Sequence, residues 1–151
     1  MCLYIKSSKK KIAEKNIRCF KILAYDVNAK KYFAPNFYEY EYTSNGVNKN
    51  KLIHSLNTSD VYSGDVYKYI CNIGLHTYRK YSDAISDNDY YNAISNRTVE
   101  YKVFECVIPR GSEYFSGAHE HNGLKKGFAS AKLKLIKEIP TKKSNNETDN
   151  Q

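Results

Sequence analysis

The pattern of apolar and polar positions predicts a sheet protein with one helix. The stretch 17–26, IRCFKILAYD, is nearly continuously apolar and rich in β-forming residues, which is typical of a central strand. The stretch 97–108, RTVEYKVFECVI, places apolar side chains on both faces, and Pro109 ends it. These two stretches give the strongest strand predictions in the chain.

Three further strands follow from shorter patterns. In 37–42, FYEYEY, aromatic residues alternate with glutamates, which indicates a strand with one solvated face. Another strand is expected over 66–70. The stretch 128–139, FASAKLKLIKEI, predicts a single strand with its leucines facing inward and its lysines facing outward.

Polar and glycine-containing stretches predict the connections between these strands. The stretch 9–16, KKKIAEKN, is expected to be a charged connector or a single helical turn, and 44–51 a loop. A turn is expected at Ser63 and Gly64. The stretch 110–127 contains four glycines and predicts a long loop.

The stretch 82–95, SDAISDNDYYNAIS, predicts the main helix. It places Ala84, Ile85 and several later apolar residues on roughly one face. Its acids gather toward the amino end, where the helix dipole favours negative charge. Ser82 is expected to cap that end.

Strands around one helix, without a βαβ alternation or an internal repeat, predict an α+β fold. The sheet is expected to be mixed but mostly antiparallel, either continuous or split. The 151 residues fit one domain, expected over 1–139, and 140–151 predict a disordered polar tail.

The formal net charge of +8 raises the question of a polyanionic partner. The positive residues gather in two clusters, 6–21 and 125–143, while the middle of the chain is nearly balanced. If the two segments meet in space, the clusters form one basic face for phosphate or for an acidic protein. The bias toward Lys, Asn and Tyr is also what an AT-rich genome produces.

The cysteines and the apolar runs indicate the cellular compartment. The four cysteines are widely spaced, without a CxxC pair, and no secretory leader is recognisable, so we expect a reducing cytoplasm. Cys19, Cys71 and Cys106 lie in apolar runs and are expected to be small buried hydrophobes. No apolar run approaches the roughly 20 residues of a membrane span, so no membrane is expected.

The stretch 74–84, GLHTYRKYSDA, is the first candidate for chemistry. His76 either locks the corner between strand and helix through backbone carbonyls, or acts as an acid or base beside Tyr78, with Arg79 or Lys80 supplying positive charge. The second candidate is HEH, 119–121. Its two histidines could bind Zn²⁺ from one face of a strand, with His54 or Glu113 completing the shell, but the spacing is not that of a metal-binding helix, so an exposed loop tip is expected.

The stretch GLHTYRKYSDA resembles an element of small uncharacterised proteins from bacteriophages and gut bacteria, in which glycine, an apolar residue, histidine and an aromatic residue precede a helix. In that group a strand ending like 107–117, VIPRGSEYFSG, precedes one that opens with alanine and serine, here 128–136, FASAKLKLI. The order of elements from Ile17 to Ile139 looks like the split-sheet core of ADP-ribosyltransferase-like folds.

That resemblance implies NAD as the substrate of any enzymatic activity. Such enzymes tend to carry an arginine or histidine on the first strand, where Arg18 stands, and a hydroxyl or tyrosine motif in the middle, near His76. They also carry a late-strand glutamate, but here 128–139 has none until Glu138, and Lys132 stands nearer the expected place. Because a lysine cannot accept the ribose hydrogen bond, this departure favours loss of transferase chemistry.

The sequence therefore favours a small accessory protein, encoded by a phage or mobile element, that binds a protein partner in the host cytoplasm without catalysis, cofactor or metal. The expected contact residues are Lys132, Lys134, Arg79, Lys80 and Arg110, beside exposed tyrosines. The first alternative is an NAD-using transferase built on His76, Arg18 and Tyr78. The second is a nucleic-acid-binding protein, which requires the lysine clusters to share one face.

Overall fold

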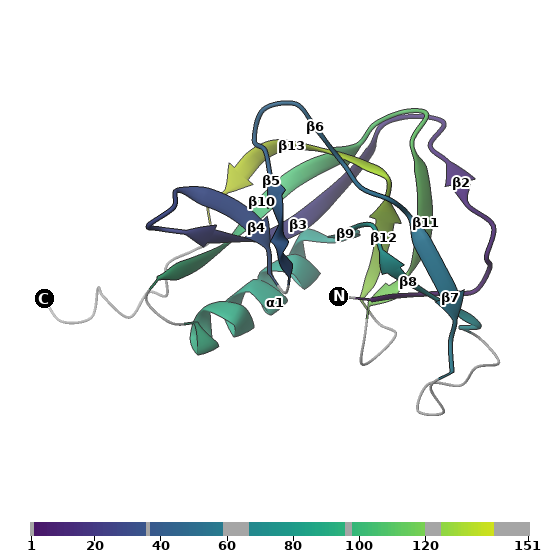
Figure 1. Ribbon diagram of the computed structural model, residues 1–151, viewed down its shortest axis with the longest axis horizontal. Coiled ribbons are helices and arrows are strands. Elements are labelled where there is room, and N and C mark those ends of the chain that lie inside the picture. The colour runs from purple at the N-terminus through teal and green to yellow at the C-terminus, as the bar shows by residue number, and fades with distance from the viewer. Residues whose placement is uncertain (1, 36, 59–66, 96–97, 120–124, 141–151) are drawn as a thin grey trace, which may run out of the picture.

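The computed structural model describes residues 2–35, 37–58, 67–95, 98–119 and 125–140, and this part contains thirteen strands and one helix (Figure 1). The helix is α1 (Tyr81–Ile94). The strands are β1 (Leu3–Ile5), β2 (Lys11–Ile12), β3 (Ile17–Asp26), β4 (Lys31–Ala34), β5 (Phe37–Tyr42), β6 (Val47–Lys49), β7 (Ile53–Leu56), β8 (Tyr69–Ile73), β9 (Leu75–Tyr78), β10 (Val99–Ile108), β11 (Glu113–His119), β12 (Lys126–Ser130) and β13 (Lys132–Ile139).

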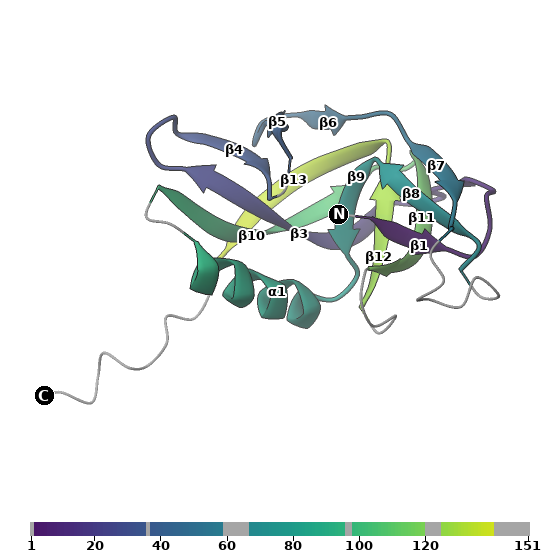
Figure 2. The same cartoon turned by 60° about the horizontal axis from the view of Figure 1, so that its bottom comes forward.

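The strands form one curled sheet that resembles half of a barrel, as Figures 1 and 2 show. Its main order is β6-β13-β10-β3-β9-β12-β11-β1-β8-β7, with β2 beside β11, β4 beside β3, and β5 beside β4. Every strand pairing in the described part is antiparallel. The α+β class is therefore confirmed, whereas the expectation of a mixed sheet is wrong for these residues.

The two strongest strand predictions are confirmed, and their residues pair along their whole length. Ile17 lies opposite Ile108 and Asp26 opposite Val99. One face of β3 packs Phe20 and Ile22 against α1, which lies along this side of the sheet (Figure 2). The opposite face buries Cys19 and Leu23 in the largest core cluster. Burial on both faces explains the nearly continuous apolar pattern of β3.

The predicted loop 110–127 contains a full strand, β11, so that prediction is wrong. Gly117 lies within this strand opposite Gly127, and an added Cβ would stand 2.0 Å from the carbonyl oxygen of Tyr4. Because Gly117 has no side chain, β1 can approach β11 closely. Close approach of another backbone is a common reason for a glycine within a strand. Residues 120–124 lie outside the described residues.

Four smaller expectations also need correction. The stretch 9–16 forms neither a simple connector nor a helical turn, because β2 pairs there with β11. The predicted loop 44–51 contains β6. The stretch 128–139 forms two strands, β12 and β13, that separate at Ala131. The helix begins at Tyr81 with Lys80 as N-cap and no side-chain capping bond, so Ser82 is not the cap.

Two further expectations concern residues that the structure does not describe. The turn expected at Ser63 and Gly64 and most of the tail expected from residue 140 lie outside the described residues. Among the described helical residues, none forms a segment long and apolar enough to cross a membrane.

Candidate anion-binding site

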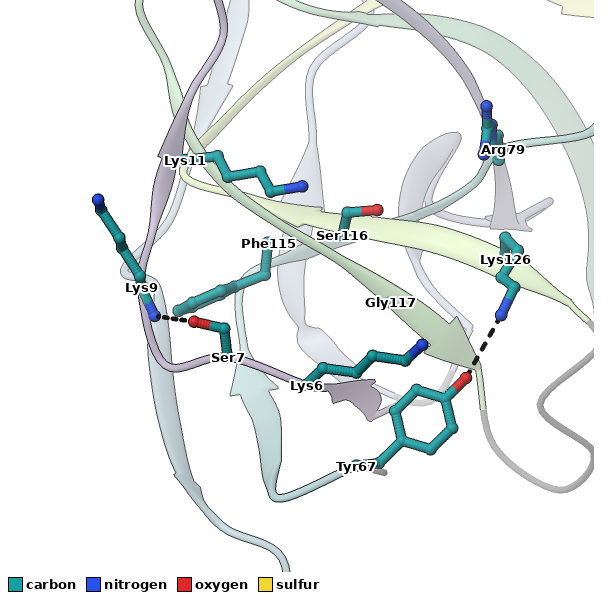
Figure 3. Close-up of a pocket in the computed structure, with 10 residues that line it drawn as sticks. All are labelled: Lys6, Ser7, Lys9, Lys11, Tyr67, Arg79, Phe115, Ser116, Gly117 and Lys126. Atoms are coloured by element: carbon teal, nitrogen blue, oxygen red, sulfur yellow. Dashed lines mark hydrogen bonds between the residues drawn. The ribbon is translucent and has the colours of Figure 1, made fainter. Parts of the chain in front are cut away.

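A hollow of about 330 Å³ lies where the N-terminal segment crosses β11 and β12 (Figure 3). The lining combines cationic side chains, two serines and two aromatic rings: Lys6, Ser7, Lys9, Lys11, Tyr67, Arg79, Phe115, Ser116, Gly117 and Lys126. Lys11 reaches into it from one side, and Arg79 and Lys126 stand on the other, while the ammonium of Lys9 points away. We call this site the basic hollow.

Strand pairing brings these distant residues together. Lys126 begins β12 and lies opposite Ala118 of β11. The backbone N–H of Arg79 donates to the carbonyl of Lys126 at 3.0 Å, which holds these two residues side by side. On the other flank Tyr4 pairs with Ala118, so the chain that leaves β1 with Lys6 runs along β11.

The cations of the basic hollow have no acidic partner among the described residues. No described carboxylate lies within 4.0 Å of the charged groups of Lys6, Lys11, Arg79 or Lys126. The ammonium of Lys126 instead donates to the hydroxyl of Tyr67 at 3.3 Å. Like charges held near one another repel, so an anion bound here relieves an existing repulsion.

A shallower groove of about 1010 Å³ continues from the basic hollow and shares Ser7, Lys9 and Lys11 with it. The groove adds Lys10, Ile12, Glu14, Lys15, Ile17 and Tyr114 to the lining. We call the hollow and the groove together the basic trough. In the groove part of the positive charge is balanced, since Lys10 lies 3.6 Å from Glu113.

The basic trough joins parts of the two charge clusters that the sequence shows. Lys126 comes from the C-terminal cluster, and the other lysines come from the N-terminal one. Of the five predicted binding residues, Arg79 lines the hollow, whereas Lys80 precedes α1. Arg110 also does not line the trough, and its backbone N–H donates to the side chain of Asn16 at 2.9 Å.

The other two predicted binding residues lie on a different part of the sheet. Lys132 and Lys134 are both exposed on β13, where they pair with Lys49 and Val47 of β6. Neither lines the hollow or the groove. The two clusters therefore meet only in part.

The three residues of the transferase alternative lie in separate surroundings. Arg18 donates through Nε to Oε1 of Glu105 at 2.6 Å on an exposed part of β3. Tyr78 donates its hydroxyl to Oδ2 of Asp87, and burial together with this bond raises its pKa well above the usual value. His76 and Tyr78 are buried, whereas the Arg18 side chain is exposed to solvent, so these three side chains do not share one accessible surface.

His76 is held in the way expected of a structural histidine. It is 8% exposed, with Nδ1 3.1 Å from the carbonyl of Gly74 and Nε2 3.0 Å from that of Cys71. Burial lowers its pKa to about 3. The buried imidazole is therefore neutral near pH 7 and has one N–H to donate to one of the two carbonyls.

The first residue of the HEH triplet, His119, is buried, although the sequence suggested an exposed loop tip. His119 ends β11, is 4% exposed, and places Nε2 2.7 Å from the carbonyl of Thr77. His54, considered as a partner ligand, instead packs its ring against Tyr69 and Phe115. Residues 120 and 121 lie outside the described residues.

The structure also contains a buried cation that the sequence analysis did not single out. Lys21 is 4% exposed in the middle of β3, donates to the carbonyl of His76 at 2.6 Å, and lies 5.0 Å from the ring centre of Tyr42. Burial lowers its pKa to about 8. A lone lysine within a nearly continuous apolar strand was the signal that could have revealed it.

The prediction for three cysteines is confirmed. Cys19, Cys71 and Cys106 are fully buried and unbridged. Burial raises the pKa of Cys19 and of Cys71 to about 12 and that of Cys106 well above its usual value. Their thiols therefore stay protonated and unreactive near neutral pH.

Comparisons of the chain with protein-family models, with curated proteins and with solved structures gave no match.

Proposed function

We propose that this protein is a non-enzymatic binding protein that holds a single-stranded nucleic acid in the basic trough. The observation that carries this proposal is the meeting of Lys6, Lys11, Arg79 and Lys126 at one hollow, with no carboxylate partner among the described residues. A groove lined by cations that follow an extended path is the usual means of binding a nucleic-acid backbone without sequence preference.

The composition of the trough favours a nucleic acid over the protein partner that the sequence analysis preferred. Protein interfaces are depleted of lysine and depend on a few large apolar anchors. The trough has many lysines, and its largest apolar ring, Phe115, is 2% exposed. The exposed apolar side chains Ile53 and Leu56 lie on β7, outside the trough, and Ile12 is the one exposed aliphatic side chain among the described residues that line it.

The finer structural and biological expectations remain part of the proposal. They include an ADP-ribosyltransferase-like topology, a phage or mobile-element origin and a cytoplasmic location. The transferase alternative needs a carboxylate in place of the missing late-strand glutamate. Glu105, on β10, is already engaged by Arg18 and also lies 3.7 Å from Lys137, so the geometry gives this alternative little support. A rise in melting temperature with NAD that does not weaken with salt would revive it.

The test is the salt dependence of binding to a labelled single-stranded oligonucleotide, measured by fluorescence anisotropy. We expect the logarithm of the association constant to fall with the logarithm of salt, with a slope of about −0.7 for each phosphate neutralised. The double variant Lys6→Gln, Lys11→Gln should weaken binding and make this slope less steep by about 1.4.

The matched control changes two lysines outside the trough. The double variant Lys132→Gln, Lys134→Gln removes the same charge from exposed positions on β13. It should leave the slope nearly unchanged. Equal effects of the two double variants would show that net charge, and not the trough, governs binding.

A further inference from the structure

We infer that the basic hollow binds the terminal phosphate of the nucleic-acid strand, a phosphate monoester, while the groove holds internal phosphodiesters. This inference rests on the proposed function and adds the chemical group that one end of the trough recognises. Three features of the hollow carry it, namely its charge, its donors and its boundary.

Positive charge is not evenly spread along the basic trough. In the groove Glu14 is part of the lining and Glu113 pairs with Lys10. In the hollow four inward or rim cations have no described carboxylate within 4.0 Å. A monoester carries a charge of about −1.5 to −2 near pH 7, against −1 for an internal diester, so the doubly charged end is attracted most strongly to the hollow.

The donors of the hollow also outnumber the oxygens of a diester. A terminal phosphate offers three strong acceptor oxygens, whereas a diester has two non-bridging ones. Arg79 can present a bidentate fork, and Lys6 and Lys11 add ammonium donors from the opposite side. The hydroxyl of Ser7 accepts from the N–H of Lys9 at 3.2 Å, which leaves its own proton to donate.

The hollow is bounded at the end opposite the groove. Figure 3 places Tyr67 there, across from Lys11, which is shared with the groove. Lys126 bonds to the Tyr67 hydroxyl at 3.3 Å, and the ammonium of Lys6 lies 5.8 Å from the centre of its ring. A nucleic-acid strand that runs along the groove therefore meets the Tyr67 ring. This barrier suits the end of a nucleic acid better than a nucleic-acid backbone that continues.

The experiment compares three single-stranded oligonucleotides of one sequence with an internal fluorophore. One carries a 5′-phosphate, one a 3′-phosphate, and one has hydroxyls at both ends. We expect one phosphorylated strand to bind about tenfold more tightly than the hydroxyl strand, a difference that one or two charge-assisted hydrogen bonds supply. Arg79→Gln should abolish this preference, whereas Lys15→Gln in the groove should weaken all three strands by the same factor.

Each outcome decides the inference. Equal affinity for the three strands, with binding still sensitive to Lys11→Gln, overturns the inference and leaves the proposed function intact. No binding by any strand overturns both. If inorganic phosphate alone raises the melting temperature as much as the phosphorylated strand does, the hollow recognises free phosphate, and the assignment to a strand end is overturned. A preference that persists in Arg79→Gln also overturns it.

Discussion

The ammonium of Lys21 donates a 2.6 Å hydrogen bond to the backbone carbonyl of His76 and thereby ties β3 to β9. The two strands share a single register pair, Phe20 with Tyr78, so this side-chain bond strengthens a short junction in the curled sheet. His119 makes a similar contact with the next carbonyl, that of Thr77. The four-residue strand β9 therefore carries one buried basic side chain, His76, and its backbone carbonyls bind two more, Lys21 and His119.

Because the amine of Lys21 is buried, we predict that the substitution Lys21→Met increases stability, by an amount that depends on pH. The folded chain holds the pKa of Lys21 at about 8, because burial disfavours the charged form, against 10.5 for an unperturbed lysine. Between these values the unfolded chain binds more protons, so the Lys21 contribution to stability rises with pH. Below pH 8 the penalty is complete, roughly 3 kcal/mol.

Urea unfolding of both proteins from pH 7 to 10 measures this effect. After loss of the bond to His76, which costs about 1 kcal/mol, Lys21→Met should be more stable than the parent by about 2 kcal/mol at pH 7. The difference should shrink as the pH rises above 8. Comparing the two proteins removes the shared effects of the buried thiols. A variant that is less stable by the same amount at every pH would contradict the prediction.

The two buried histidines predict loss of stability in acid. Burial lowers the pKa of His76 to about 3 and that of His119 to about 4, from 6.5. Below pH 6.5 the unfolded chain therefore binds more protons, so stability is complete above this value and falls toward pH 4. Each histidine should cost roughly 3 kcal/mol at pH 4.

Replacement by glutamine tests this assignment. His119→Gln keeps an N–H that can donate to Thr77 but removes the titration, so its urea midpoint should fall less steeply between pH 7 and 4 than that of the parent. The control is His54→Gln, in which the lost ring packs against Tyr69 and Phe115. If the two variants flatten the acid profile equally, His119 is not responsible for it.

Gly127→Ala should be among the most damaging small substitutions in the chain. An added Cβ would lie 2.0 Å from Nε2 of His119 and 2.3 Å from the carbonyl oxygen of Thr77, the two atoms of one buried hydrogen bond. Strand pairing fixes the positions of His119 and Thr77, so the clash cannot be relieved by the movement of a flexible surface side chain. We expect a loss of at least about 3 kcal/mol, or failure to fold.

Gly111→Ala provides the comparison. That glycine has φ of +86°, and nothing lies within 4 Å of an added Cβ, so the cost is limited to backbone strain of about 1 to 2 kcal/mol. Melting temperatures of the two variants give the order directly. A Gly127→Ala protein that is as stable as Gly111→Ala would show that β12 and β11 can separate without cost.

The trough shows why the candidate site could be predicted only in part. The sequence marked both lysine clusters and singled out Arg79, but it also singled out Lys132 and Lys134, which β13 carries to the opposite part of the sheet order. The deciding element is β11, since its pairing with β1 and β12 brings Lys6 near Lys126. This strand was predicted as a loop, and no local pattern indicated its partners.

The sequence by itself determined β3, β10 and the inward leucines of β13, because each has a local apolar pattern that burial imposes. It also predicted the range of α1 to within one residue at each end, although the buried residues of this helix are Ala84 and Asn88, and Tyr90 and Ile94 are exposed. It did not determine the roles of glycines such as Gly117. In the sequence this glycine indicates a loop, and only the structure shows that the backbone of Tyr4 lies against it. Only the tertiary structure decided which lysines share a surface and that Lys21 is buried. Charge proximity and desolvation depend on residues far apart in the chain, and strand pairing alone brings those residues together.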